Sequence, residues 1–297
     1  MGQPLADPRT AKFLLPTDVD LDNMGTMVRA FKEDRETLRQ LLLMLYGFTA
    51  LGGPQPKCTF VNEDGALSVA KFFGPEQPDW MPRAEVLFTT LALAAGLHTV
   101  RPRLLHPVFR PWVISPRFDR DATGGRRPYL SARSLMLAGQ GDQINSMELL
   151  EQVQLFSKNF AADAKEIWRR LVFGRLIGKA PETVDEFEFL YAGHGKWQLA
   201  PGCGFRPRFP EAEPKPTDPR PYLLLPRDVE TLLATAGQFG IEKNDALLEV
   251  RHQINVIKTW TSRAPEFMFN LNHRQIDAIA PLIDNTQFRL AVTLVGH

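Results

Sequence analysis

Hydrophobic and polar residues follow two different periods along the chain, and the period changes near its middle. Between residues 57 and 73, two runs of β-branched and aromatic residues flank the turn sequence Asn-Glu-Asp-Gly, which predicts a β-hairpin that turns between Phe60 and Leu67. Residues 101–121 alternate and contain prolines, which predicts two more strands of the same sheet. Residues 81–97 form an apolar run of helical length. The first half is therefore expected to be a small sheet with a helix laid across it.

From residue 146 onward the pattern is helical, because apolar residues recur every three or four positions. The segments with this pattern are residues 147–161, 162–178, 226–240 and 246–264. Residues 22–47 show the same spacing, which predicts a further helix near the N-terminus. The patterns together predict an α+β fold with a tail at residues 1–20, a sheet-rich N-lobe at residues 21–140 and a helical C-lobe at residues 141–297.

Prolines interrupt the helical half between residues 207 and 226, where there are seven of them. Proline lacks a backbone N–H and fixes its own φ, so this density excludes a regular helix or a central strand. We expect a stiff, extended loop.

Composition places the chain among ordinary globular proteins, with 297 residues, 44% of them hydrophobic and 23% charged. Its 35 basic and 34 acidic residues give a formal charge of +1, so no global field favours nucleic acid or an anionic membrane. The two cysteines, Cys58 and Cys203, lack the spacing of a zinc site or a disulfide framework. No apolar run has the length of a signal peptide or a membrane span. We therefore expect a cytoplasmic protein without a membrane or direct nucleic-acid partner.

One group of residues has the order that a nucleotide-binding site requires. Gly52 and Gly53, with Lys57 just after them, offer a turn in which the backbone can approach phosphates closely. Lys71 lies on the second predicted strand, and Glu85 lies near the start of the following helix. A strand lysine followed by a helix glutamate is the order found in protein kinases. Each feature is common on its own, and their combination indicates a site of nucleotide-binding type.

Several segments in succession resemble motifs of the HipA-like serine/threonine kinases, the toxin half of bacterial toxin–antitoxin pairs. The segments are LGGPQPKCTFVNEDGALSVAKFF, AEVLFTTLALAAGL, VISPRFDRDATGGRRPYLSARSL, IWRRLVFGRLIG and GKWQLAPGCGFRP. The strand RFDR, residues 117–120, is the most specific of them. The resemblance implies a bilobal, protein-kinase-like fold that begins at the kinase core, without the N-terminal subdomain of longer members.

The resemblance also implies roles for individual residues on the nucleotide side of the site. The Gly52 and Gly53 turn would cover the phosphates, Lys71 would reach them, and Glu85 matches the helix glutamate of the family. Asp119, within RFDR, falls where the family has a structural or nucleotide-proximal aspartate. ATP is thus a candidate ligand.

The catalytic side departs from the family pattern. That pattern is roughly G-N-x-D-D-H-x-x-N-x-x-F-L, and residues 178–190 read GKAPETVDEFEFL. In this register Pro181 replaces the catalytic aspartate, Glu186 replaces the metal-binding asparagine, and Gly204 replaces the second metal-binding aspartate. Phosphoryl transfer needs an orienting carboxylate and a metal clamp, which proline and glycine cannot supply. The sequence therefore predicts a pseudokinase in which Mg²⁺ binding is not favoured.

Two questions about function stay open at the level of sequence. The acidic residues Glu182, Asp185, Glu186 and Glu188 could support a different ATP-dependent transfer reaction, or they could form a solvated helix start. We favour the second reading, together with a role in binding a protein, either a toxin–antitoxin component or a related kinase. A protein-binding module that takes no nucleotide is the remaining alternative.

Overall fold

The computed structural model describes Ala30 and residues 55–62, 65–74, 77–105, 111–120, 125–137, 143–179, 186–208, 222–224 and 228–296. The chain forms two compact units. Unit 1 comprises Met1–Val86 and Arg101–Arg126, and unit 2 comprises Leu87–Val100 and Arg127–His297. The predicted tail, the phosphate turn at Gly52 and Gly53, and all of the helix predicted at residues 22–47 except the helical Ala30 lie outside the described residues.

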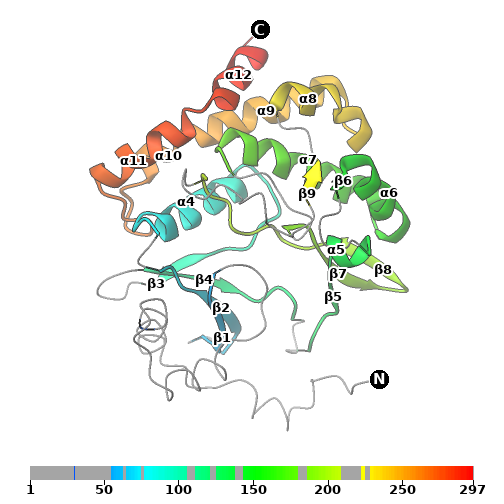
Figure 1. Cartoon of the computed structure of the whole chain (residues 1–297), viewed down its shortest axis with the longest axis horizontal. Helices are drawn as coiled ribbons and strands as arrows, with labels where there is room; N and C mark the ends of the chain where they lie inside the picture. The colour runs from blue at the N-terminus through cyan, green and yellow to red at the C-terminus, as the bar shows by residue number, and fades with distance from the viewer. Residues whose placement is uncertain are drawn as a thin grey trace. The chain divides into compact units, whose positions relative to one another are not determined.

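Unit 1 contains a four-stranded antiparallel sheet in the order β1-β2-β4-β3 (Figure 1). Its strands are β1 (Lys57–Val61), β2 (Leu67–Lys71), β3 (Arg103–Leu105) and β4 (Trp112–Pro116). The β1–β2 turn closes through a hydrogen bond of 2.9 Å from Gly65 N to Asn62 O, and Gly65 takes a left-handed φ of 76° that suits glycine. The predicted hairpin and the two further strands are therefore confirmed.

One face of this sheet is apolar and buried. Its members are Cys58, Phe60, Ala70, Phe72, Trp112 and Ile114. Phe72 and Trp112 meet edge to face, with their ring centroids 5.1 Å apart. Because side chains alternate along a strand, the residues between them, including Lys57 and Lys71, belong to the opposite face.

The prediction that RFDR forms a strand is wrong. β4 ends at Pro116, and Phe118 and Asp119 form a bend that leads to an isolated bridge between Arg120 and Arg126. Arg117 N still donates to Leu67 O at 2.9 Å, but Leu67 is the first residue of the partner strand β2, so no further residue of β2 is available to pair with the motif.

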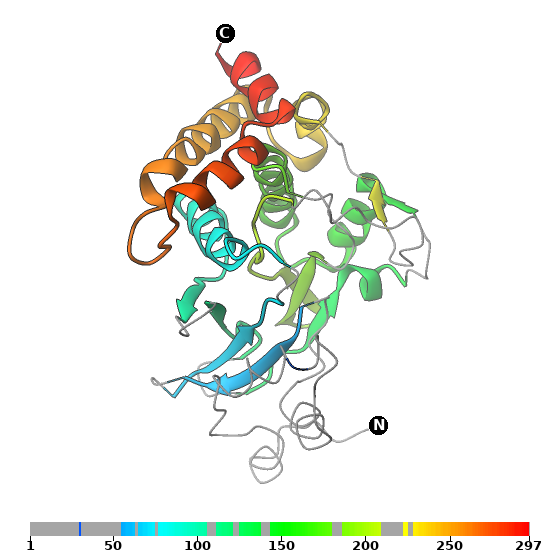
Figure 2. The same ribbon diagram turned by 60° about the vertical axis from the view of Figure 1, so that its left-hand side comes forward.

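Unit 2 is mainly helical, as predicted. Its helices are α5 (Ala132–Leu135), α6 (Ser146–Phe156), α7 (Phe160–Leu176), α8 (Val229–Ala234), the 3₁₀ helix η2 (Ala236–Phe239), α9 (Lys243–Ile257), α10 (Trp260–Arg263), α11 (His273–Ile283) and α12 (Thr286–Val295). Helix α4 (Met81–Ala94) begins in unit 1 and ends in unit 2. Helix α7 carries much of the core: Ile167, Trp168, Leu171, Val172 and Phe173 are fully buried. Helices α6, α8, α9 and α12 all contact α7 (Figures 1 and 2).

Asparagine or aspartate side chains start most of the longer helices of unit 2. These N-cap residues are Asn145, Asn159, Asp228, Asn272 and Asn285. Each side chain accepts a hydrogen bond from a backbone N–H of the first turn, which would otherwise lack a partner within the helix. None of the helices in the described part of the chain combines the length and hydrophobicity needed to span a bilayer.

Unit 2 also contains two small sheets. Strands β5 (Tyr129–Ser131), β7 (Glu188–Gly193) and β8 (Lys196–Leu199) form an antiparallel sheet, and β6 (Gln143–Asn145) pairs in parallel with β9 (Tyr222–Leu224). β9 lies inside the segment predicted to be loop throughout, so that prediction is wrong for these three residues. Tyr222–Leu224 contains no proline and can supply the N–H groups that the neighbouring prolines lack.

Candidate functional site

Lys71 and Glu85, predicted as partners from their order in the chain, form an ion pair within unit 1. Lys71 ends β2, and its Nζ lies 2.6 Å from Oε2 of Glu85 on α4. The two side chains are 17% and 6% exposed. The Lys71 ammonium also lies 5.3 Å from the centroid of the Phe73 ring, a cation–π contact. The lysine is therefore held in one position by an opposite charge and an aromatic face.

Lys57 lies directly opposite Lys71 in the register of β1 and β2. Opposed residues of antiparallel strands point to the same face of the sheet, so two ammonium groups share the face on which Glu85 meets Lys71. The face therefore carries two ammonium groups together with the Glu85 carboxylate. The glycine turn that would complete it lies outside the described residues.

Asp119 is the centre of a charged cluster at the end of β4. Arg117 binds it in bidentate fashion, with Nε to Oδ1 at 2.8 Å and Nη2 to Oδ2 at 2.5 Å, and Arg120 Nη1 lies 2.7 Å from Oδ2. Burial raises the pKa of the Asp119 carboxyl, but the hydrogen bond and charge of Arg117 and the charge of Arg120 outweigh it, so the pKa lies below its usual value. Arg117 also donates to Thr59 Oγ1 at 2.8 Å, which connects the cluster to β1. Asp119 thus acts as a structural clamp in this structure.

The described part of the acidic segment after α7 is engaged by neighbouring side chains. Lys179 Nζ forms an ion pair with Glu186 Oε2, and the Tyr129 hydroxyl donates to Glu188 Oε1. Pro181, Glu182 and Asp185 lie outside the described residues. The two described glutamates therefore do not form an open acidic cluster.

Gly204 lies in a loop, Pro201 to Phe205, that contains two glycines with different structural requirements. Its φ of 69° lies in the left-handed region, and a Cβ at this position would meet no atom within 4 Å. Gly202 is the reverse case: a Cβ there would lie 2.9 Å from the Phe205 ring and 3.2 Å from Arg170 Nε. Glycine at 202 is needed for close packing, whereas glycine at 204 takes a left-handed φ without strain and leaves open space where a Cβ would lie.

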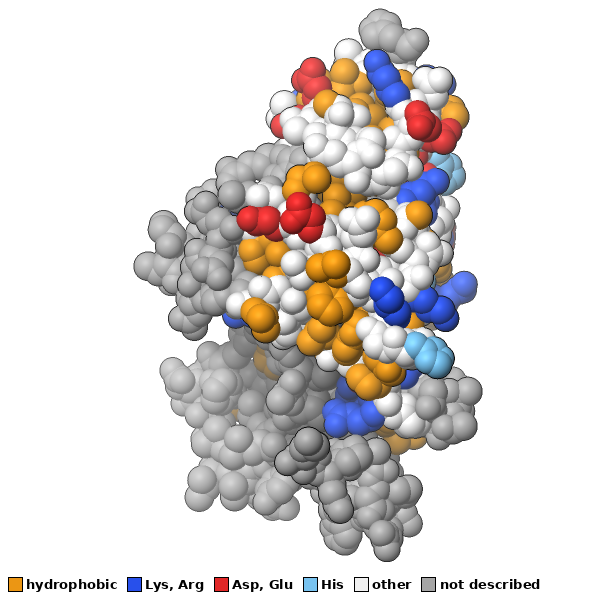
Figure 3. All heavy atoms as spheres, turned by 90° about the vertical axis from the view of Figure 1, so that its right-hand side faces the viewer, with side chains coloured by type: hydrophobic (Ala, Val, Ile, Leu, Met, Phe, Trp, Pro, Cys, Tyr) orange, Lys and Arg blue, Asp and Glu red, His pale blue; other side chains and the backbone are white. Residues whose placement is uncertain are grey.

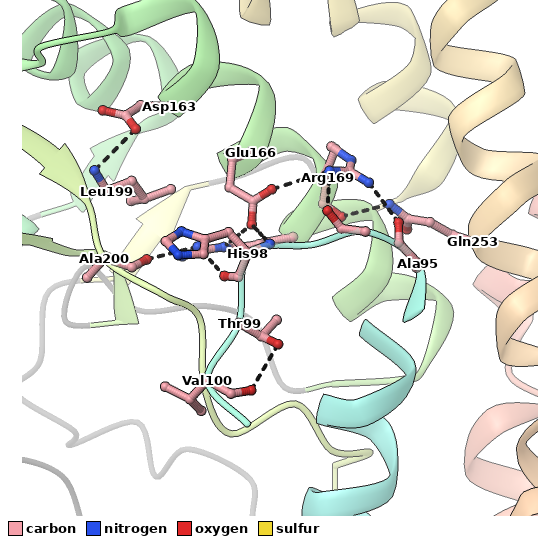
Figure 4. Close-up of polar contacts among 12 residues, drawn as sticks. Ala95, His98, Thr99, Val100, Asp163, Glu166, Arg169, Leu199, Ala200 and Gln253 are labelled. Carbon is pink, nitrogen blue, oxygen red and sulfur yellow. Dashed lines mark hydrogen bonds and ion pairs between the residues drawn. The ribbon is translucent and has the colours of Figure 1, made fainter. Parts of the chain in front are cut away.

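Two arginines of α7 hold this loop and the segment after α4 (Figure 4). Arg170 donates to His98 O at 2.8 Å, Ala200 O at 2.9 Å and Glu166 Oε1 at 2.8 Å. The backbone closes the same junction, because Gly202 N donates to His98 O at 2.8 Å and Val100 N donates to Gly202 O at 3.0 Å. The loop that bears Gly204 is thereby fixed to the middle of the helix.

Arg169 makes a second set of contacts beside the first. It donates to Ala95 O at 2.7 Å (Figure 4). It also donates to Gly96 O at 2.8 Å, and its Nε lies 2.7 Å from Glu249 Oε1 on α9. The sequence reasoning gave these arginines no role. The available signal was an Arg-Arg pair between the apolar residues Ile167, Trp168, Leu171 and Val172 of α7, where charged side chains need fixed partners.

Asp163 is a buried carboxylate on the same helix. Its oxygens accept hydrogen bonds from Ser157 Oγ at 2.6 Å and Leu199 N at 3.2 Å, which links the α6–α7 turn to β8. Burial raises the pKa of Asp163 above its usual value, against the effect of these hydrogen bonds. The pKa of the nearby His98 is lowered, first by burial and then by the charge of Arg170.

A model of the HipA-like C-terminal domain family matches residues 49–202, slightly more than half of the chain. The chain belongs to this HipA-like family. No curated protein matches the sequence. The matched region includes Lys71, Glu85, Asp119 and Glu186 and ends two residues before Gly204.

Two solved structures resemble the HipA-like chain in fold. One is HipA of Shewanella oneidensis MR-1, from a complex of the toxin–antitoxin proteins HipA and HipB with operator DNA (TM-score 0.61, 15% identity, 84% of this chain and 66% of that chain). The other is the proinflammatory kinase CtkA of Helicobacter pylori (TM-score 0.58, 16% identity, 84% of this chain and 94% of that chain). The predicted α+β, kinase-like fold with antiparallel sheet and helical parts is confirmed.

The positions at which the family register expects metal ligands are occupied in this chain by Glu186 and Gly204. Mg²⁺ requires hard oxygen ligands in near-octahedral geometry. Glu186 has such oxygens, but one of them is paired with Lys179, and Gly204 has no side chain. Among the residues that the structure describes, no three His, Cys, Asp or Glu side chains are grouped to hold a metal ion.

Proposed function

We propose that this HipA-like protein is a pseudokinase: it keeps a nucleotide pocket, transfers no phosphate and works by binding another protein. The observation that carries the proposal is Gly204. At the position of the expected metal-binding aspartate there is no side chain, and the left-handed φ of 69° disfavours most side chains other than asparagine or aspartate. In the same chain, the 2.6 Å pair of Lys71 and Glu85 supports a retained nucleotide site.

The chemistry of phosphoryl transfer explains why these changes matter. The reaction depends on positioning and on charge stabilisation of the transferred group, and the protein supplies little else. Replacing the orienting aspartate by Pro181 removes a contribution of about 10²- to 10⁴-fold to the rate. Loss of a metal ligand at Gly204 removes part of the charge stabilisation as well. Phosphate transfer at an ordinary kinase rate is therefore not expected.

A surface of unit 2 supports the protein-binding role. Leu155 and Phe156 at the end of α6 are 64% and 37% exposed, and Tyr191 on β7 is 36% exposed, with its ring 5.5 Å from that of Trp197. The end of α6 and the β7–β8 hairpin are neighbours, because Lys196 Nζ donates to Leu155 O at 2.9 Å and Lys158 N donates to Trp197 O at 2.7 Å. We call these four apolar side chains the α6–hairpin patch.

Exposed apolar groups in adjacent elements are typical of protein interfaces, where aromatic side chains act as anchors. Figure 3 shows hydrophobic side chains gathered across the middle of one face, with basic side chains beside them. The Shewanella HipA structure contains HipB and operator DNA. We propose that the partner of this chain is likewise a component of a toxin–antitoxin system, or a related kinase, and that they meet in the cytoplasm.

Phosphate transfer is the direct test of the first part. Purified protein is incubated with γ-labelled ATP and Mg²⁺, alone and with candidate partners, and no labelled product is expected. Label transfer that disappears in Lys71→Ala would overturn the proposal. Binding is measured separately by calorimetry with ATP, where Lys71→Ala is expected to weaken the affinity.

The protein-binding part is tested with a surface variant. Leu155→Glu places a charge in the α6–hairpin patch and should abolish copurification of the native partner. Leu248→Glu is a matched control, because Leu248 is also exposed, at 59%, but lies on α9. A partner that is retained by both variants would show that the patch is not the interface.

A further inference from the structure

We infer that the α6–hairpin patch binds an acidic segment of a partner protein, in which apolar anchor side chains are combined with aspartate or glutamate. The inference rests on the proposed function, because it assumes that the chain works by binding a protein. It adds the chemistry of the partner's contacting segment and the side of the patch that its acidic residues face. The observations that carry it are the placement of charge around the patch and the fixed geometry of the hairpin.

Lys196 places a positive charge beside the most exposed side chain of the patch. Its Nζ donates to Leu155 O at 2.9 Å, and Leu155 is 64% exposed. Leu155 lies in the last turn of α6, where the carbonyl groups form the negative end of the helix dipole and favour a cation. An ammonium group has three N–H donors, and the carbonyl takes one of them. Lys196 can therefore receive a carboxylate from a partner whose apolar side chain packs on Leu155.

Lys158 adds a second positive charge on the same side of the patch. It follows α6, and its backbone N donates to Trp197 O on β8 at 2.7 Å. The side chains of Lys158 and Lys196 are both exposed. Within the part of the chain that the structure describes, neither lysine is paired with a carboxylate. The hairpin side of the patch therefore offers two ammonium groups to a partner.

The hairpin holds its part of the patch in a fixed geometry. Gly193, His194 and Gly195 form its turn and have left-handed φ values of 91°, 52° and 72°. The Tyr191 hydroxyl accepts a hydrogen bond from Gly195 N at 3.0 Å, so a side chain of the patch closes the turn. The Tyr191 and Trp197 rings meet edge to face. A surface formed in advance loses little conformational entropy when it binds a partner.

The acidic residues of α6 border the patch on a different side. Glu148 completes a capping box with Asn145 at the start of α6, and Glu151 lies one turn before Leu155. Figure 3 shows acidic side chains above the central hydrophobic ones and basic side chains to their right. A nucleic-acid backbone carries only negative charge, whereas a protein segment can place its acidic residues over the hairpin alone. Leu155 is also aliphatic and has no ring on which a base could stack. The surroundings of the patch therefore favour an acidic protein segment.

The chemistry of the binding segment is tested by peptide selection. A display library of short random peptides is selected on the purified full chain, and peptides that also bind Leu155→Ser are removed. This substitution takes away the exposed apolar group without changing the charge. We expect the remaining peptides to combine Asp or Glu with Leu, Phe or Trp. Basic or neutral peptides, or the absence of any Leu155-dependent peptide, would overturn the inference.

The role of charge is tested with one selected peptide by fluorescence anisotropy. Lys196→Glu should weaken its binding by at least about tenfold, because like charges would then face each other. Lys243→Glu is the matched control, since Lys243 is an exposed lysine on α9, and it should change the affinity by less than about twofold. Lys196→Arg keeps the charge and should keep the binding. Far-UV circular dichroism confirms that each variant is folded.

Three results of these measurements would contradict the inference. Equal effects of Lys196→Glu and Lys243→Glu would remove the role of charge. Tighter binding of an oligothymidylate than of the peptide would assign the surface to single-stranded nucleic acid. A dimer in sedimentation velocity that Leu155→Ser dissociates would assign it to a second copy of this chain.

Copurification of the native partner separates this inference from the proposed function. A partner that is lost from Leu155→Glu but retained by Lys196→Glu contradicts the inference about charge and leaves the patch as the interface. A partner that is retained by Leu155→Glu removes the patch from the proposed function and overturns the inference with it.

Discussion

Replacing Arg170 by methionine tests whether this side chain holds the loop that bears Gly204. The side chain is 7% exposed and donates to Glu166 Oε1, His98 O and Ala200 O at 2.8 to 2.9 Å. Methionine has a similar length but no donor, so three acceptors lose a hydrogen bond, while Glu166 keeps its 3.5 Å ion pair with Arg169 and the hydrogen bond from His98 N. A buried group left without its hydrogen bond costs about 1–3 kcal/mol, and a broken buried ion pair costs about 3–5 kcal/mol. Since these contacts share one side chain, and Glu166 and His98 O keep other partners, we expect a total of about 1–3 kcal/mol.

The assay is urea unfolding followed by far-UV circular dichroism. Arg289→Ala is the control, because its ion pair with Asp284 is long, at 3.5 Å, and both side chains are about two-thirds exposed. Such a pair is worth less than about 1 kcal/mol. Arg170→Lys should fall between the two, since lysine keeps the charge but cannot reach three acceptors in the same geometry. If Arg170→Met destabilises the protein no more than Arg289→Ala, the view that Arg170 anchors the loop is wrong.

Three further predictions concern charge and thiol chemistry. The pKa of Asp119 is lower in the folded state than in the unfolded state. Its contribution to stability is therefore present above the unfolded pKa and is lost as the pH falls through the folded pKa. Asp119→Asn should abolish this part of the pH dependence of the unfolding free energy. The pKa of Asp163 is raised in the folded state, so the pH dependence of its contribution to stability has the opposite direction. The unfolding free energy of wild type should fall relative to that of Asp163→Asn as the pH rises through the folded pKa. Burial raises the pKa of the Cys58 thiol to about 12, whereas Cys203 is exposed. A thiol reagent should therefore label only Cys203 in the native protein and both cysteines in urea. Rapid labelling of Cys58 in the native protein would contradict this prediction.

The parts of the fold that were predicted correctly are those with local signals. The β1–β2 hairpin follows from the turn sequence that includes Asn62 and Gly65, and its closing hydrogen bond joins these two residues. Lys71 and Glu85 are 14 residues apart, on a strand and the helix that follows it, so their order in the chain was enough to suggest the pair. The end of β4 has no such local signal, because the strand ends where its partner strand β2 begins, at Leu67.

The parts that were missed depend on residues far apart in the chain. Strands β6 and β9 are three residues each, and Ile144 pairs with Leu223 across a long separation, so neither strand has a pattern of its own. Arg169 and Arg170 donate to backbone carbonyl groups. Every residue has a backbone carbonyl, so the sequence does not indicate which carbonyl groups will accept these hydrogen bonds. The predicted boundaries at residues 20 and 140, and the nucleotide-binding and catalytic roles assigned to single residues, stay predictions.

The described residues around the expected catalytic segment contact one another and neighbouring elements of unit 2. If the segment had only lost its selection for catalysis, substitutions there would leave charges without partners and backbone without support. Instead Lys179 and Glu186 form a pair, Gly202 is needed for the packing of Phe205, and Phe205 meets Phe173 of α7 edge to face at 5.6 Å. Each of these contacts stabilises the folded segment and none requires a bound metal. The described part of the segment is therefore an ordered structural element of unit 2.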